Sequence, residues 1–256
     1  DSCQPSGDGG GFAVGNVSIE NMALIADNCT FINNHAAGYG GALSIQSTLA
    51  ATIKNCTFTN NQAERGGGAI YISPTLFKGS SYSPLPSCTI LGCKFDLNND
   101  ISNKGHAIYF SFANDCTTII KIDECEFTDN YNSESTTTPG GFTISCDSPT
   151  LNITNTKIEF TNPSFSTTGL KVEEHTETLT IQECELKEIT GKPSCILSCN
   201  TITIDGLKIS SQETTETAIQ ILKSNVISIR DLSVQGQFES AIELHNSLPA
   251  GQSLQF

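Results

Sequence analysis

Acidic side chains are the residues of this sequence best suited to chemistry, because two nearby carboxylates can act as general acid and general base. The 256-residue chain has 27 Asp and Glu, and adjacent pairs occur at Asp123 with Glu124 and at Glu173 with Glu174. An enzyme that cleaves acidic polysaccharides would also need a basic group beside them. No His or Arg stands at a matching position of the repeat described below, so solvated surface carboxylates are favoured.

Histidines are the second group of candidates, since imidazole titrates near neutral pH. The four occupy different positions of the repeat and are predicted to be ordinary loop residues: His35, His106, His175 and His245. No Cys-x-x-Cys or Cys/His cluster has the spacing of a zinc site. We therefore predict no catalytic residue, no metal and no cofactor, and a protein that is not an enzyme.

Eleven cysteines in a chain rich in Asn, Ser and Thr suggest an oxidising, extracellular compartment. If successive repeats stack about 4.8 Å apart, disulfides between Cys29 and Cys56 and between Cys93 and Cys125 are within reach. Cys88, Cys116 and Cys146 lie on successive connections and could pair likewise. The equally weighted alternative is that these side chains fill the interior as small hydrophobes. An odd number leaves at least one thiol free or bonded outside the chain.

A repeat positions these residues, because residues 53–72 nearly duplicate residues 26–45, which lie 27 positions earlier. The template is an apolar residue, Cys three positions later, Phe two further on, Asn three after that, then Gly-Gly-Ala and alternating apolar residues. Such a period indicates a solenoid, a propeller or an array. Eight copies follow one another, and their first apolar residues are Ala26, Ile53, Ile90, Ile122, Ile153, Ile181, Ile204 and Ile229.

Each copy has the period of two that is typical of strands. The residue before the Cys position is Asn, Gly or Asp in six copies, and these types tolerate a left-handed bend. A strand, a bend, a second strand, a loop and a third strand make one turn of a solenoid. The sequence therefore predicts an all-β fold, a right-handed single-stranded parallel β-helix of about eight to nine coils.

Three ladders of side chains should run across the stacked coils. One is an inward cysteine column with Cys184 as its last member, and a second is an asparagine corner formed by Asn34, Asn61, Asn98 and Asn130. The third is an outward column in which opposite charges face each other: Lys94, Glu126, Lys157, Glu185 and Lys208. The same parity places Ile53, Phe58, Ile70 and Ile72 inward, and Thr57 and Tyr71 outward.

We predict one domain over residues 1–256, with an irregular glycine-rich segment at 1–11 and surface loops at 73–87 and 130–139. The chain starts at Asp1 without a signal peptide, so we expect it to be processed or excised from a longer protein. Leu254 and Phe256 resemble the first strand of a further coil, and no polar cap is visible at either end. Open strand edges promote association, so we predict end-to-end stacking on neighbouring coils of a longer parent or on other copies, as a filament.

The net charge of −14 and the presence of only two arginines exclude nucleic acid and anionic membranes as partners. No apolar run approaches the roughly 18 residues of a membrane span. Four glycosylation triplets begin at Asn16, Asn28, Asn55 and Asn152, about the number expected by chance. Asn152 is the best placed, because it alternates with inward residues and should point outward.

Two outward arrays could bind a surface. Thr178 and Thr180 align with Thr201 and Thr203, as in an ice-binding or flat-glycan-binding face, but other residue types interrupt both columns: Ser87, Ile119, Lys121, Asn152 and Ser228. Thr is also simply a good strand former, so this function is not favoured. Tyr71 and Tyr109 could form a sugar platform, although a cross-strand pair that stabilises the sheet is favoured.

Phe-x-x-Asn followed by Gly-Gly-Ala-Leu or Gly-Gly-Ala-Ile, at residues 31–43 and 58–70, resembles the repeat of the polymorphic outer-membrane protein adhesins. Degenerate versions occur at 95–108 and 127–142. The resemblance implies a parallel β-helix displayed at a cell surface, although similar repeats also occur in large surface proteins of unicellular eukaryotes.

The expected function is accordingly a secreted or surface-displayed structural and adhesive scaffold. It would be extracellular, glycosylated and disulfide-bonded, with its own copies, neighbouring coils or surface glycans as partners. The alternatives are a carbohydrate-active β-helix enzyme, such as a polysaccharide lyase or hydrolase, and a glycan-binding or ice-binding module.

Overall fold

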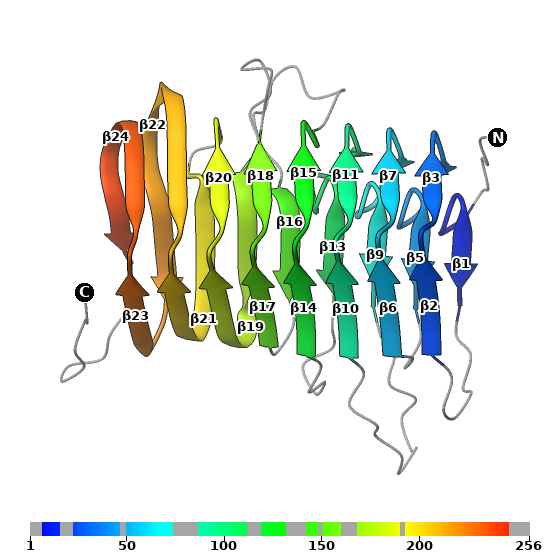
Figure 1. Ribbon diagram of the computed structural model, residues 1–256, viewed down its shortest axis with the longest axis horizontal. Coiled ribbons are helices and arrows are strands. Elements are labelled where there is room, and N and C mark those ends of the chain that lie inside the picture. The colour runs from blue at the N-terminus through cyan, green and yellow to red at the C-terminus, as the bar shows by residue number, and fades with distance from the viewer. Residues whose placement is uncertain are drawn as a thin grey trace, which may run out of the picture.

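The strands of this protein wind into one parallel solenoid whose coils stack along the long axis (Figure 1). The computed structural model describes residues 7–15, 23–46, 50–73, 87–111, 119–131, 142–147, 150–159, 168–189 and 193–245, without the side chains of 147, 173–175 and 212–216. Within these residues every strand pairing is parallel and no helix occurs. The predicted class, an all-β parallel β-helix, is confirmed.

Each coil contributes a strand to three faces. The first face consists of β2 (Ala23–Asp27), β6 (Ala50–Lys54), β10 (Ser87–Leu91), β14 (Ile119–Asp123), β17 (Thr150–Thr154), the end of β19 (Thr168–Gln182), the end of β21 (Cys195–Asp205) and β23 (Val226–Arg230). The second face consists of β3 (Thr30–Ile32), β7 (Thr57–Thr59), β11 (Lys94–Asp96), β15 (Glu126–Thr128), β18 (Lys157–Glu159), β20 (Glu185–Lys187) and the starts of β22 (Lys208–Lys223) and β24 (Ser233–Leu244).

The third face consists of β1 (Phe12–Val14), β5 (Leu43–Ile45), β9 (Ile70–Ile72), β13 (Ile108–Ser111), β16 (Phe142–Asp147), the starts of β19 and β21, and the ends of β22 and β24. A separate three-stranded sheet joins the loops between the second and third faces. It contains β4 (His35–Ala36), β8 (Gln62–Ala63) and β12 (Asn99–Asp100).

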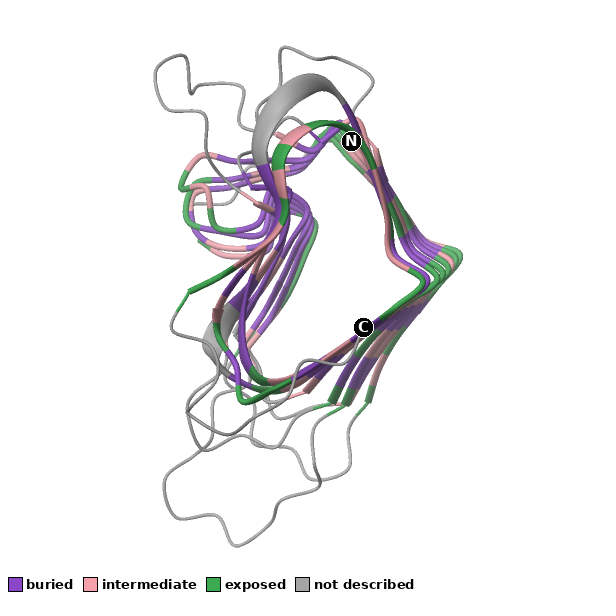
Figure 2. Ribbon diagram, turned by 90° about the vertical axis from the view of Figure 1, so that its left-hand side faces the viewer, coloured by how far each residue is buried: buried purple, intermediate pink, exposed green. Residues whose placement is uncertain are grey.

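The core is the inside of the solenoid, where alternate residues of each strand meet. Ile53, Phe58 and Ile70 are fully buried and Ile72 nearly so, which confirms their predicted inward direction. Viewed nearly along the solenoid axis, successive coils superpose (Figure 2). A coil one strand thick cannot bury an apolar side chain alone, so each relies on the coils above and below it.

A left-handed bend separates the first two strands of every coil, as the sequence predicted. All eight residues before the Cys position have φ between 46° and 72°: Asn28, Asn55, Gly92, Glu124, Asn155, Glu183, Gly206 and Asp231. A second left-handed bend follows the second strand, at Asn33, Asn60, Leu97, Asp129 and Glu188. Residues other than Gly, Asn and Asp adopt this conformation at a cost of about 1–2 kcal/mol, so Glu and Leu are held there by the stacking of the coils.

The asparagine ladder lies just after this second bend and is buried. Asn34 Nδ2 donates to Asn61 Oδ1, Asn61 Nδ2 to Asn98 Oδ1, and Asn98 Nδ2 to Asn130 Oδ1, each at 2.9 Å. Each acceptor oxygen also receives the backbone N–H of the preceding ladder residue, at 3.0–3.1 Å. The predicted corner is therefore confirmed, and its amides connect four coils.

The Gly-Gly-Ala motif forms the corner before the third face. Gly40 and Gly67 have φ near 70°, a region that glycine enters without strain. A Cβ on Gly41 would lie 2.0 Å from the carbonyl oxygen of Gly68, so only glycine lets the two backbones approach. Ala42 and Ala69 then point into the core with no exposed surface.

Substitution of a ladder residue should destabilise the fold strongly. Asn61→Ala removes the acceptor for the Asn34 amide and a donor to the carbonyl of Phe31, which leaves buried polar groups without partners. We expect the free energy of unfolding to fall by about 3 kcal/mol, measured by urea denaturation followed by circular dichroism.

The matched control is Asn60→Gly, because Asn60 is the exposed neighbour and its φ of 52° suits glycine. Its cost should stay below about 1 kcal/mol. Equal losses for the two variants would show that the buried amides do not hold the coils in place.

Leu97 offers a stabilising substitution, because it is 39% exposed and sits in the left-handed bend where the two preceding coils have Asn33 and Asn60. Leu97→Asn should raise the free energy of unfolding by about 1 kcal/mol, since asparagine enters this conformation at lower cost. Leu97→Ala removes the same exposed surface but keeps the strain, and should give no such gain. Identical stabilities of the two variants in urea denaturation would contradict this explanation.

Candidate functional site

Three tyrosines gather on the outside of the third face. Tyr71 and Tyr109 occupy equivalent positions of β9 and β13, as predicted, and their ring centroids are 5.5 Å apart. Tyr39, from the loop before β5, stacks on Tyr71 at 4.3 Å and approaches Tyr109 to 6.5 Å. Tyr39 could not be predicted as a member of this cluster from the sequence, because the residue lies outside the strand pattern.

A glycine makes room for this cluster. A Cβ on Gly66 would lie 2.6 Å from Tyr109 Cδ1 and 3.3 Å from Tyr39 Cδ1. Tyr71 is only 8% exposed, and burial raises the pKa of its hydroxyl. Tyr39 therefore covers part of the less favoured alternative, a sugar platform of Tyr71 and Tyr109, and the ring contacts between coils agree with the favoured cross-strand pair.

The described cysteines are free thiols, so the structure does not support the proposed disulfides of Cys29 with Cys56 and of Cys93 with Cys125. Cys88 and Cys146 form no disulfide either, and Cys116 lies outside the described residues. The thiols of the inward column bond instead to the carbonyl two residues earlier, at 3.2–3.4 Å, from Cys56, Cys93, Cys125 and Cys184.

Thr156 takes the Cys position in its coil and makes the same bond, from Oγ1 to the carbonyl of Thr154 at 2.9 Å. The position therefore selects a small side chain that donates to the backbone at the bend. Burial raises the pKa of Cys56 to about 11 and that of Cys88 to about 12, which keeps both protonated near neutral pH. The hydrogen bond with Cys125 lowers the pKa of Cys93, but that thiol is buried and bonded to the backbone like the others, so the column is structural.

The predicted outward charge column is in register over all five members: Lys94, Glu126, Lys157, Glu185 and Lys208. Lys94 and Glu126 form an ion pair at 3.1 Å. Lys157 departs from the expectation, because its ammonium contacts Glu159 on its own strand at 2.5 Å. Lys187 binds the same carboxylate at 2.5 Å, and the two ammonium groups lower the pKa of Glu159.

The acidic pairs do not form a general acid–base site in the described residues. Thr154, Lys121 and Asn155 bond to the Asp123 carboxylate and hold its pKa below its usual value, although partial burial opposes this. Glu124 forms the bend itself. The side chains of Glu173, Glu174 and His175 lie outside the described part of the chain.

The remaining histidines lie apart from these carboxylates in the fold. His35 is on the small sheet, 3.7 Å from Glu64, and His245 follows the last strand, 3.1 Å from Glu243. His106 is fully buried in the corner before β13. In the part of the chain that the structure describes, no group of His, Cys, Asp and Glu is arranged to bind a metal ion.

Asp100 is a buried carboxylate that sequence reasoning did not single out. Desolvation raises its pKa to about 6, against hydrogen bonds from the amides of Lys104 and Ser102 and from the Ser102 hydroxyl. All these donors belong to the loop after β12, so Asp100 organises its own turn. Asp100 is in register with Ala63, which is in register with Ala36, and both alanines are buried. This correspondence between the coils is the one sequence feature that could have predicted the burial of Asp100.

The glycosylation candidates differ in position. Asn28 and Asn55 are exposed at the first bend, on adjacent coils. Asn152 is half-buried in β17, in register with Lys121 and Thr180. Asn16 lies outside the described residues. Asn28 and Asn55 are thus more exposed than Asn152. Glycosylation of any of these asparagines stays a prediction.

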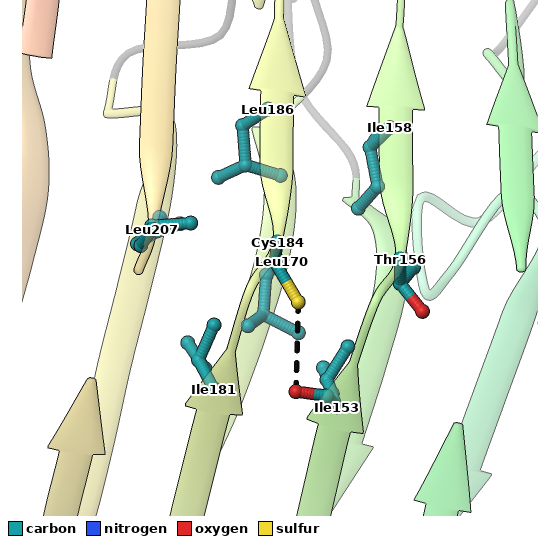
Figure 3. A pocket seen from close by; sticks show the side chains of 9 residues that line it. Ile153, Thr156, Ile158, Leu170, Ile181, Cys184, Leu186 and Leu207 are labelled. Carbon is teal, nitrogen blue, oxygen red and sulfur yellow. Dashed lines mark hydrogen bonds between the residues drawn. The ribbon is translucent and has the colours of Figure 1, made fainter. Parts of the chain in front are cut away.

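An internal cavity of about 20 Å³ lies where the phenylalanine column ends (Figure 3). Phe31, Phe58, Phe95 and Phe127 stack with centroids 4.6–4.9 Å apart, and Ile158 and Leu186 continue the column with smaller side chains. The polar atoms at its wall are already bonded, Cys184 Sγ to the carbonyl of Ile153 at 3.5 Å and Thr156 to its strand. The cavity is a packing defect rather than a ligand site.

No helix in the described ranges is long and apolar enough to cross a membrane. Searches of curated proteins and of solved structures each gave no significant match. Residues 28–46 and 55–73, however, match the family model of the Chlamydia polymorphic membrane protein repeat. Both segments run from the first bend through the second-face strand, the asparagine corner and Gly-Gly-Ala to the third-face strand. The resemblance seen in the sequence is thereby confirmed: two adjacent coils of this solenoid carry the polymorphic membrane protein repeat.

Proposed function

We propose that this chain is a cell-surface scaffold whose β-helix displays adhesive surfaces. The observation that carries the proposal is the family match of residues 28–46 and 55–73, two adjacent coils of the solenoid. The Phe, Asn and Gly-Gly-Ala positions of those segments make contacts between neighbouring coils. Such an interior supports an extended rod and leaves the outer faces for partners.

The proposal gains support from the state of the ionisable groups. Asp123 and Glu159 have lowered pKa values because cations and hydrogen-bond donors contact them, which suits structural carboxylates. Asp100, whose pKa burial raises to about 6, is buried and bonded within its own turn. A general acid would instead need a raised pKa in an open cleft. A scaffold function is therefore preferred to a polysaccharide-cleaving one.

Surface display and adhesion can be tested together. Antibodies against the folded chain should label intact cells that produce it, because a displayed scaffold is accessible without permeabilisation. Beads coated with the chain should bind cultured cells several-fold better than beads coated with urea-unfolded chain, since the faces exist only in the stacked state. Labelling that requires permeabilisation, or equal binding of both bead types, would refute the proposal.

We further propose that copies of the chain associate end to end. Inward residues are only half-buried at the two ends of the described solenoid: Leu24, Cys29, Phe31, Leu232, Val234, Phe238 and Ile242. Among the described residues, strands β2 and β3 pair on one side only, with β6 and β7, and β23 pairs only with β21. Unpaired strand edges beside partly exposed apolar residues favour the addition of another strand layer.

The association should depend on concentration and on the apolar edge of β2. Ile25 is 68% exposed there, and Ile25→Lys places on the edge a charge that opposes strand addition. We expect sedimentation velocity to show species larger than the 27.3 kDa monomer at high concentration, and the variant to reduce them.

Ile119→Lys is the matched control, because Ile119 is also exposed but lies on β14, which is paired on both sides. It should associate like the unmodified chain. A monomer at all concentrations, or the same loss in both variants, would rule out association through the ends.

A further inference from the structure

The outward surface of the first face differs in charge from that of the second face. Its outward residues form two columns across the strands, each in register. The first is Ala23, Ala50, Ser87, Ile119, Thr150, Thr178, Thr201 and Val226, and the second is Ile25, Thr52, Thr89, Lys121, Asn152, Thr180, Thr203 and Ser228. All residues of both columns are at least partly exposed.

These two columns contain no carboxylate in the strands described, although the chain has 27 Asp and Glu. Lys121 is their one charged member. The second face, by contrast, carries charges along most of its length: Lys94, Asp96, Glu126, Lys157, Glu159, Glu185, Lys187 and Lys208. Charges lie at both margins of these columns: Asp27, Lys54, Asp123 and Asp205 beside the bend, and exposed Glu177 directly before Thr178 on β19. The two columns therefore form a neutral strip.

Hydroxyl and amide groups are ordered most regularly at the centre of the strip. Thr150, Thr178 and Thr201 are in register on β17, β19 and β21, and Asn152, Thr180 and Thr203 are in register two residues further on. Strand geometry sets a spacing of about 4.8 Å across the strands and about 7 Å along them. The residues that interrupt the threonine columns here, Asn152 and Ser228, are themselves small, uncharged hydrogen-bonding residues.

We propose that this strip binds a neutral, extended polysaccharide. Each hydroxyl can both donate and accept a hydrogen bond, which suits a polymer that repeats hydroxyl groups along its length. Exposed Ile119 and Val226 flank the ordered block and can cover the apolar faces of sugar rings. The absence of carboxylates removes electrostatic attraction for a cationic partner, and Lys121 breaks the uniform array that an ice surface would require.

The proposal goes beyond a scaffold role and rests on this face alone. Its test is co-sedimentation of the chain with insoluble cellulose and chitin, with polygalacturonate gel as an acidic comparison. We expect retention on a neutral polymer that changes little between low and high salt, because the strip has almost no charge. Retention on the acidic gel alone would overturn the proposal.

Two pairs of variants locate the contact. Thr180→Glu combined with Thr203→Glu should weaken retention about tenfold or more, because the charges would be desolvated without partners. Thr180→Val combined with Thr203→Val keeps the shape and strand propensity, removes the hydroxyls, and should also weaken retention while the circular dichroism spectrum is unchanged.

Thr57→Glu combined with Ser233→Glu adds the same charge to outward positions of the second face and should leave retention unaffected. Retention on neither neutral polymer, or an equal loss in this control, would overturn the assignment. Adsorption to growing ice crystals without polysaccharide retention would overturn it in favour of ice binding.

Discussion

Stacking of identical side chains in register is the constraint on which this structure depends. One coil is a single strand thick, so a phenylalanine ring finds its packing partners only on the coils before and after it. The asparagine ladder adds a directional requirement, because each buried amide must meet the carboxamide of the next coil. A shift of one residue would turn these amides and the phenylalanines toward solvent, so burial and hydrogen bonding select the same register.

The bends follow from this constraint. Adjacent coils superpose only if each turns at the same place, and every coil does so through left-handed residues even where the sequence supplies glutamate, as at Glu124 and Glu183. The cysteine column has a similar origin. Its thiols bond to strand carbonyls at the bend, and Thr156 performs the same task with a hydroxyl. The position is thus defined by size and donor capacity rather than by sulfur chemistry.

An interior so fully used for stacking leaves recognition to the outer faces and the loops. The second face is occupied by charges whose partners lie on neighbouring rungs or on the same strand, such as Glu159 between Lys157 and Lys187. The first face is neutral and carries ordered hydroxyls. The third face is partly covered where Tyr39 folds over Tyr71. These differences give one rod three chemically distinct surfaces.

The sequence by itself determined the solenoid, the direction of the strand residues, the asparagine corner and the register of the charge column. It could do so because a two-residue period combined with a repeat assigns each strand residue both a side and a rung. Only the tertiary structure decided what this pattern leaves open: the contact of Lys157 with Glu159, the free thiols, the buried Asp100 and the cover that Tyr39 places over Tyr71. Long side chains reach neighbours along the strand as easily as across it, and loop residues follow no period. Their partners therefore depend on three-dimensional packing that the spacing of residues does not encode.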